Sequence, residues 1–261
     1  MSFKQVTAYL EKNSLRLFYM FLGAAVLLRL LDDVLLGRWG IHAGAIFPYR
    51  HPGYFPLYGT TGLLLEWALA LTGGVLLFTN EKRKGAFFAA IAMSLSLSQM
   101  MQNQKILLWI VLWIVALTDL GKNIPARKFL KWQIVLVYTF GALSKIFDQF
   151  VTGETLHIIA LRQMETTTGL QKFLWSPLLN SGFSTMVSYA VIALELLIPL
   201  LFIRKKEWAW FFVLVLHGGF VVMMKDLSSF TFSMFALASL YYCPDVMMTD
   251  EDLIQPVNEP G

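Results

Sequence analysis

Long apolar runs recur along the whole chain, each bounded by charged residues or by glycine and proline. They lie at roughly 15–36, 61–79, 85–101, 106–120, 132–147, 184–203, 208–224 and 228–242. About 20 mostly apolar residues cross the hydrocarbon core of a bilayer, where a helix satisfies its own backbone hydrogen bonds. The pattern predicts an all-α, polytopic integral membrane bundle of about eight transmembrane helices, multi-pass in the cell (inner) membrane.

The composition excludes a soluble globule of this size. Of the 261 residues, 57% are hydrophobic and only 15% are charged, so there is too little polar surface to cover a soluble fold. We expect one transmembrane domain over residues 1–243 and a short acidic cytoplasmic tail over 244–261. The net charge of +4 is spread over many loops, so the lipid bilayer and not nucleic acid is the expected partner. With one cysteine and no metal-ligand spacing among the histidines, no metal is expected.

The positive charges give the orientation of the spans. Cytoplasmic loops collect Lys and Arg. Thirteen of the 21 Lys and Arg residues fall in one set of alternate segments, and six fall in the other set. This bias puts both termini in the cytoplasm. The two long connections, 37–60 and 148–183, then face outward, and the second carries a pattern typical of an amphipathic surface helix.

Ionisable side chains inside apolar runs each need a partner, because an unpaired charge in the hydrocarbon layer costs several kcal/mol. Arg29 and Asp32 are three residues apart in one run and share a helix face. Glu66 and Glu195 interrupt two other runs. Each carboxylate either bridges to Arg29 or is protonated, and both alternatives stay open. Arg29 is either half of a structural ion pair or a contact for an anionic substrate.

Lys145 ends the fifth run at its predicted outer edge. One interpretation is a lysine that extends its ammonium group into the lipid headgroups. The other is a general base, because an apolar pocket disfavours the ammonium form. His217 lies in the middle of the seventh run beside two glycines, which favours either helix packing or a place in a polar pocket.

Polar amides gather at the outer end of the third and fourth runs, in the segment QNQK. Asn103, Gln104 and Lys105 form either a solvated turn or the edge of a pocket for a ligand carbonyl group. Together with Tyr138 of the fifth run, they complete our candidate substrate-binding set, which also contains Arg29, Glu195 and His217.

Several segments resemble the HTTM proteins, which share a transmembrane module with vitamin K-dependent gamma-glutamyl carboxylase. The segment ALSKIFDQFVTGETL resembles that family's lysine motif, with Lys145 on the lysine and Gly153 on a later glycine, but with Ala142 and Phe150 where glycine and tryptophan are usual. In the same order, LLRLLDD, QNQKILLWIVLW, ELLIPLLF and LHGGFVVMM resemble other family segments.

The resemblance implies that Lys145 is the catalytic base and that a quinone or hydroquinone is the candidate cofactor or substrate. Gln104 stands where the family has histidine, and the large lumenal domain of the carboxylase has no counterpart, so we do not expect glutamate gamma-carboxylation. The length is similar to that of short bacterial members related to the sporulation-delaying peptide maturation factor.

Three function classes stay open at this point. The first is an HTTM-like membrane enzyme or maturation factor that acts at the extracytoplasmic face on a lipophilic substrate, a quinone or a secreted peptide. The second is a non-catalytic scaffold or chaperone for a secreted peptide or a partner membrane protein. The third is a respiratory-type accessory subunit similar to the DoxX group. The enzyme hypothesis predicts that Lys145 and the polar residues of neighbouring helices share one recess.

Overall fold

A computed structural model describes residues 3–35, 59–99, 103–166, 168–204, 206–223 and 228–245. Within these ranges every element is a helix, as the sequence predicts. The helices are α1 (Phe3–Leu35), α3 (Thr60–Leu76), α4 (Lys82–Gln99), α5 (Asn103–Leu117), α6 (Ile124–Ile146), α7 (Glu154–Thr166), α8 (Gly169–Trp175), η1 (Ser176–Leu179), α9 (Ser181–Arg204), α10 (Lys206–Met223), α11 (Ser228–Ser239) and η3 (Leu240–Tyr242).

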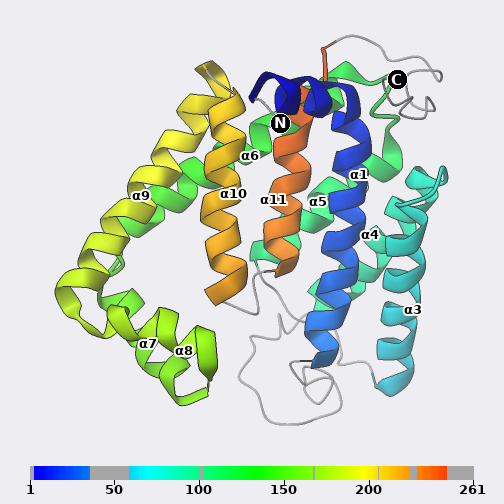
Figure 1. The fold of residues 1–261 in the computed structure, drawn as a ribbon. Coiled ribbons are helices and arrows are strands. Elements are labelled where there is room, and N and C mark those ends of the chain that lie inside the picture. The colour runs from blue at the N-terminus through cyan, green and yellow to red at the C-terminus, as the bar shows by residue number, and fades with distance from the viewer. Residues whose placement is uncertain are drawn as a thin grey trace. The chain divides into compact units, whose positions relative to one another are not determined.

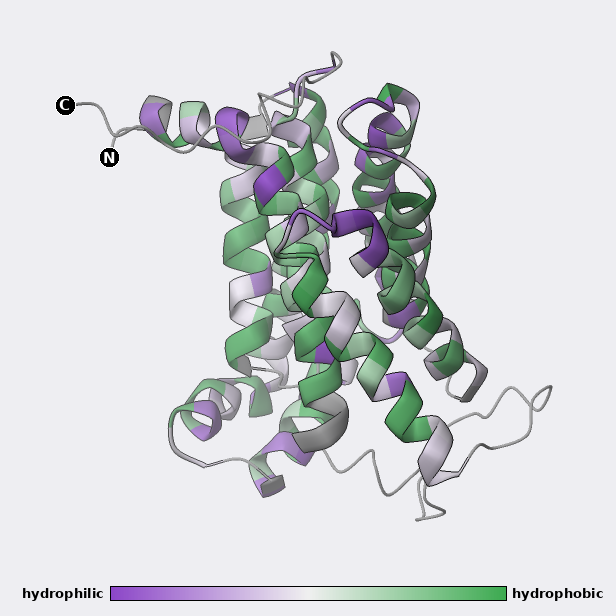
Figure 2. Cartoon of the chain, turned by 90° about the vertical axis from the view of Figure 1, so that its right-hand side faces the viewer, coloured by the Kyte–Doolittle hydropathy of each residue, from purple (hydrophilic) through white to green (hydrophobic). Residues whose placement is uncertain are grey.

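Over its described residues, each of the eight apolar runs lies largely in a helix. Figure 2 shows long stretches of hydrophobic residues along the helices, with hydrophilic residues mainly near helix ends and in connections. Among the described residues, Gln5–Leu31 and Ser181–Arg204 are long and apolar enough to cross a membrane. Other apolar helices are shorter: α5 has 15 residues and so extends about 22 Å, less than the roughly 30 Å hydrocarbon core. The all-α class is therefore established, and the eightfold crossing belongs to the proposal below.

The chain folds into two compact units. The first contains Met1–Leu130 and Asp226–Gly261, and the second contains Lys131–Lys225. Helix α6 begins in the first unit and continues in the second. The start of α6 follows from its sequence: Asn123 Oδ1 accepts a hydrogen bond from the N–H of Ala126, and Pro125 occupies the first turn, where its missing N–H is harmless.

In the first unit, α1 packs against α11 and α3, and α4 packs against α3 and α5 (Figure 1). The ring of Phe21 on α1 lies 6.0 Å from Phe232 and 5.7 Å from Phe235 of α11. Helices α3 and α4 approach closely at Gly73, where a Cβ atom would lie 2.5 Å from the backbone nitrogen of Ala89. Small residues thus permit the close helix contact that is typical of membrane proteins.

Arg127 has a structural role that its place in a predicted cytoplasmic loop does not reveal. Its side chain is fully buried and donates hydrogen bonds to the carbonyl oxygens of Leu120 and Gly121, and at 3.2 Å to that of Pro244. The guanidinium group therefore connects the loop between α5 and α6 to the chain just after η3. Most of the predicted acidic tail, from residue 246 onward, lies outside the described residues, as do residues 36–58 of the first outer connection.

In the second unit, the segment predicted as one amphipathic surface helix forms two helices, α7 and α8. The chain reverses between them near Gly169, which has a φ of 58°. The buried residues Ala160, Trp175 and Leu178 form a small core that α9 covers through Val187. His157 Nδ1 lies 3.3 Å from the carbonyl oxygen of Leu178, so this outer-loop histidine connects α7 to η1.

Gly153 lies in the turn between α6 and α7, where its backbone conformation and its contact with α9 both favour glycine. Its φ is 79°, in the left-handed region that favours glycine. A Cβ atom here would lie 2.4 Å from the backbone nitrogen of Thr185 on α9. The hydroxyl of Thr185 donates a 2.6 Å hydrogen bond to the carbonyl oxygen of Thr152 at the same contact. The close packing against α9 therefore explains why glycine occupies position 153, which the resemblance to the HTTM motif had pointed out.

We expect Gly153→Ala to destabilise the protein strongly, because the alanine is strained by its φ and collides with backbone atoms. Gly169→Ala is the matched control, since its φ is also positive but a Cβ atom there meets nothing within 4 Å. The control should lower the free energy of unfolding by roughly 1 kcal/mol, and Gly153→Ala by roughly 2 kcal/mol more. Denaturant unfolding in detergent micelles measures both, and equal losses would refute the close contact with α9.

Candidate functional site

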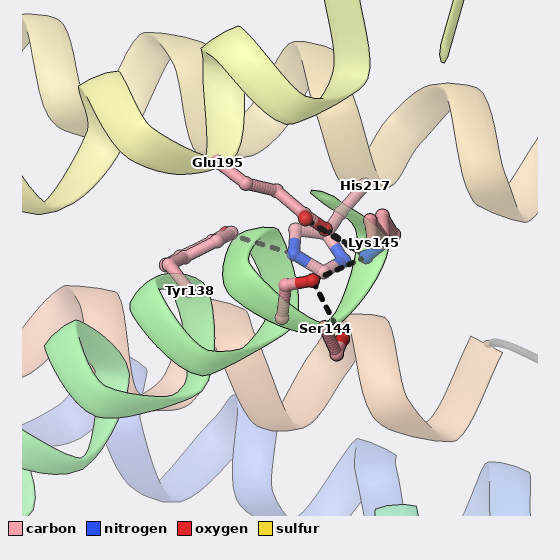
Figure 3. A network of polar contacts seen from close by, with 6 residues as sticks. Tyr138, Ser144, Lys145, Glu195 and His217 are labelled. Carbon is pink, nitrogen blue, oxygen red and sulfur yellow. Dashed lines mark hydrogen bonds and ion pairs between the residues drawn. The ribbon is translucent and has the colours of Figure 1, made fainter. Parts of the chain in front are cut away.

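An ion pair between Lys145 and Glu195 is the centre of the second unit's polar site (Figure 3). The Nζ atom of Lys145 on α6 lies 2.8 Å from each carboxylate oxygen of Glu195 on α9. The lysine side chain is 25% exposed and the glutamate side chain is 9% exposed. The carboxylate is therefore held inside the protein, while the ammonium group has partial access to the outside.

The local structure of α6 positions the lysine. Lys145 lies in the last turn of α6, where the partial negative charge of the helix C-terminus favours a cation. Its Nζ atom also lies 3.4 Å from the carbonyl oxygen of Gly141, which accepts a 2.9 Å hydrogen bond from the hydroxyl of Ser144 as well. On another side, Nζ lies 5.5 Å from the ring centre of Phe150, within the range of a cation–π contact.

A proline lies one turn after the glutamate on α9. Pro199 is inside α9, four residues after Glu195. Because proline has no N–H, it cannot donate to the carbonyl oxygen of Glu195, its usual partner in a helix. The backbone at Glu195 thus has an acceptor free of its normal helical bond next to the carboxylate. The sequence segment ELLIPLLF therefore places two polar features at one level of an otherwise apolar helix.

A second polar pair lies beside the ion pair. The Nε2 atom of His217 on α10 and the hydroxyl of Tyr138 on α6 are hydrogen-bonded at 2.8 Å, and both side chains are buried. The imidazole also packs edge-on against the ring of Phe220, 5.6 Å away. Figure 3 shows the imidazole of His217 next to the ion pair, so α6, α9 and α10 all contribute to one group of polar side chains.

The structure brings together four of the predicted site residues: Tyr138, Lys145, Glu195 and His217. The structure gives Glu195 and Lys145 a partner that the sequence analysis did not name, which is each other. The carboxylate of Glu195 binds the ammonium group of Lys145 with both oxygens. The ammonium group of Lys145 contacts that carboxylate while a quarter of its side chain stays exposed, so the headgroup and general-base interpretations both stay predictions.

The remaining predicted residues belong to the first unit, where a different polar cluster is buried. Arg29 and Glu66 line a cavity of about 10 Å³ together with Ser96, and both are 5% exposed. Lys105 is 1% exposed and donates a 2.5 Å hydrogen bond to Ser96. The side chains of Asp32, Asn103 and Gln104 lie outside the described residues. A recess shared by Lys145 with this first set stays a prediction.

Sequence reasoning missed three contributors to these sites. Gly141 provides an acceptor for Lys145, Phe150 provides an aromatic face, and Ser96 binds Lys105. Gly141 was detectable in principle, because residues four apart share a helix face. Ser96 and Lys105 lie on two helices, so their contact depends on packing that spacing does not encode.

Within the described residues, the fold is all-helical and contains two helices long and apolar enough to cross a membrane, and one unit carries a lysine–glutamate pair and a tyrosine–histidine pair. No protein-family model, curated protein or solved structure matches this chain.

We expect the two halves of the ion pair to contribute unequally to stability. Lys145→Met leaves a buried carboxylate unpaired and should cost roughly 3 kcal/mol, the lower end of the range for such a loss. Glu195→Gln should cost less, because the partly exposed lysine can reach solvent. The loss of unfolding free energy in the double variant should be smaller than the sum of the two single losses by roughly 1–3 kcal/mol. Additive losses in denaturant unfolding would show that the pair carries no coupling energy.

Tyr138→Phe should destabilise the protein by roughly 1–3 kcal/mol, because His217 then loses its buried hydrogen-bond partner. Tyr189→Phe is the control: Tyr189 is on α9 and is 57% exposed, so its loss should stay within about 0.5 kcal/mol. Thermal unfolding of both variants in the same detergent is the measurement. A Tyr138 variant as stable as the control would contradict the hydrogen bond.

Proposed function

We propose that this chain is a multi-pass, HTTM-like membrane enzyme or maturation factor in which Lys145 accepts a proton from a lipophilic substrate at the extracytoplasmic face. A hydroquinone is the substrate class for the test, and a secreted peptide is the other candidate of the same site. The observation that carries the proposal is the Lys145 ammonium group held by both oxygens of Glu195 with a quarter of the lysine side chain exposed.

The placement in a membrane is supported by two observations. Helices α1 and α9 contain candidate spans of 27 and 24 residues, and the most apolar 18-residue windows in them have mean hydropathies of 1.7 and 2.3. Helix α9 also exposes large apolar side chains such as Met186, Leu200 and Ile203, which are 58%, 59% and 64% exposed. An exposed apolar helix face of this kind needs a lipid or protein partner.

The step assigned to the protein is a proton transfer, and the oxidant is oxygen dissolved in the medium. The deprotonated hydroquinone gives two electrons and its second proton to O2, the Lys145 ammonium group returns the first proton, and quinone and hydrogen peroxide are the products. In the resting pair, the ammonium group of Lys145 can pass its proton to the carboxylate of Glu195, which leaves a neutral amine and a neutral acid. The amine then takes the O–H proton of a hydroquinone, which becomes an anion beside the new ammonium group. General base catalysis of this type contributes about 10²- to 10⁴-fold to a rate. Tyr138 and His217 would set the polarity of the pocket wall.

The test uses variants that replace the amine of Lys145 and one that exchanges Lys145 with Glu195. Lys145→Met and Lys145→Arg remove the base, because guanidinium does not give up its proton at working pH. The double variant Lys145→Glu/Glu195→Lys keeps an ion pair between α6 and α9 but moves the amine to the other helix. We expect all three to lower protein-dependent oxidation of an added hydroquinone by oxygen, in nanodiscs, by roughly a hundredfold.

The charge-exchanged variant separates catalysis from structure. It should unfold at a higher denaturant concentration than Lys145→Met, because it keeps an ion pair. It should unfold at a lower concentration than the wild type, because a carboxylate at position 145 loses the favourable helix C-terminus and the Gly141 and Phe150 contacts. Its oxygen uptake should be lost. Full oxygen uptake by a stable exchanged variant, or by Lys145→Met, would overturn the role of Lys145 as the base.

A non-catalytic scaffold is the second candidate, and one observation favours it. Helix α8 exposes Leu170 and Phe173, 65% and 71% exposed, as an apolar contact surface next to polar residues. Under this alternative the Lys145–Glu195 pair is structural only. Under it, cells with a stable Lys145→Met variant should release the secreted peptide, or assemble the partner membrane protein, as wild-type cells do. Cells with the double variant Leu170→Ser/Phe173→Ser should not.

A further inference from the structure

A cavity in the first unit is lined by residues of α1, of α4 and the turn before it, and of the end of α5 with the loop that follows. Its volume is about 720 Å³, within the range of roughly 300–1,000 Å³ typical of small-molecule sites. The proposed enzymatic site does not use it, since all of its lining residues belong to α1, the turn before α4, α4, and the end of α5 with the following loop.

Two kinds of side chain line this cavity. Tyr19, Phe87 and Phe88 form an aromatic wall, and Lys82 and Arg83 provide cations at the rim. The Nζ atom of Lys82 lies 4.9 Å from the ring centre of Tyr19, so the first cation is fixed over the aromatic wall. An apolar wall with cations at its edge matches a molecule that has an acidic head and an apolar body.

The charges around the cavity leave an excess of positive charge. Glu81 is paired with Lys84 at 2.9 Å, and both are exposed, so they offset each other. Asp119 accepts a 2.9 Å hydrogen bond from the N–H of Gly121. Burial, and then the positive charge of the nearby Arg16, lower the pKa of Lys82 below its usual range. Cations crowded in this way are stabilised when an anion binds between them.

We propose that this cavity binds the phosphate of an anionic phospholipid, with Lys82 and Arg83 holding the headgroup and the aromatic wall contacting the glycerol and upper acyl chains. The inference rests on the proposed membrane placement. The position agrees with it, because Lys82 and Arg83 come directly before the apolar run at 85–101, at the predicted cytoplasmic edge. Basic pockets on that side of helical membrane proteins are typical sites of acidic lipids.

Native mass spectrometry of the detergent-purified full chain tests the proposal with phosphatidylglycerol as the probe. We expect Lys82→Gln and Arg83→Gln each to weaken binding roughly fivefold, whereas Lys82→Arg retains it. Lys128→Gln is the matched control, because Lys128 is an exposed cation of the same unit that does not line the cavity. Binding should weaken as the salt concentration rises.

Two further binding measurements distinguish an acidic lipid from a neutral lipid and from free phosphate. Equal binding of phosphatidylcholine, or an equal loss in Lys128→Gln, would overturn a site for acidic lipid. Displacement of phosphatidylglycerol by inorganic phosphate at millimolar concentration would identify a free-phosphate site instead and would also overturn it. Should Lys82→Gln fail to fold, the exposed Arg83→Gln gives the same readout. None of these results depends on hydroquinone oxidation, so the two proposals fail separately.

Discussion

The ion pair between Lys145 and Glu195 constrains the second unit more than any other contact. A single charge on an apolar helix is costly, and a bidentate pair between two helices offsets that cost only in one relative rotation of the helices. The 2.8 Å contacts to both oxygens thus fix the end of α6 against the middle of α9. The neighbouring bond between Tyr138 and His217 fixes α6 against α10 in the same way.

The positions of the helices were predictable because each apolar run marks a segment that avoids water. The residues at which the helices begin and end were not predictable from hydropathy. Helix α1 begins at Phe3, about 12 residues before the first apolar run, because KQVTAYLEKNS contains good helix formers that hydropathy does not count. Similarly, α6 begins at Ile124 and includes polar residues before its apolar part. The break between α7 and α8 was missed because a run of amphipathic spacing continues through Gly169.

The site was predictable residue by residue but not as a set of pairs. Lys145, Glu195 and His217 stand out because each is polar within an apolar run. Which carboxylate meets which cation depends on helix rotation and depth, and these are set by packing. Glu195 is 50 residues from Lys145, and Tyr138 is 79 residues from His217, so neither partner follows from local spacing.

Lys105 and Lys145 differ in a way that favours only Lys145 as a base. Lys105 is 1% exposed and donates to the hydroxyl of Ser96, so a substrate has no route to its amine without movement of the surrounding helices. Lys145 is 25% exposed and contacts a carboxylate that can receive its proton. A base needs both an acceptor for its own proton and an open side for the substrate. A fully buried lysine has no open side for the substrate, so its role is structural even when it has a hydrogen-bond acceptor.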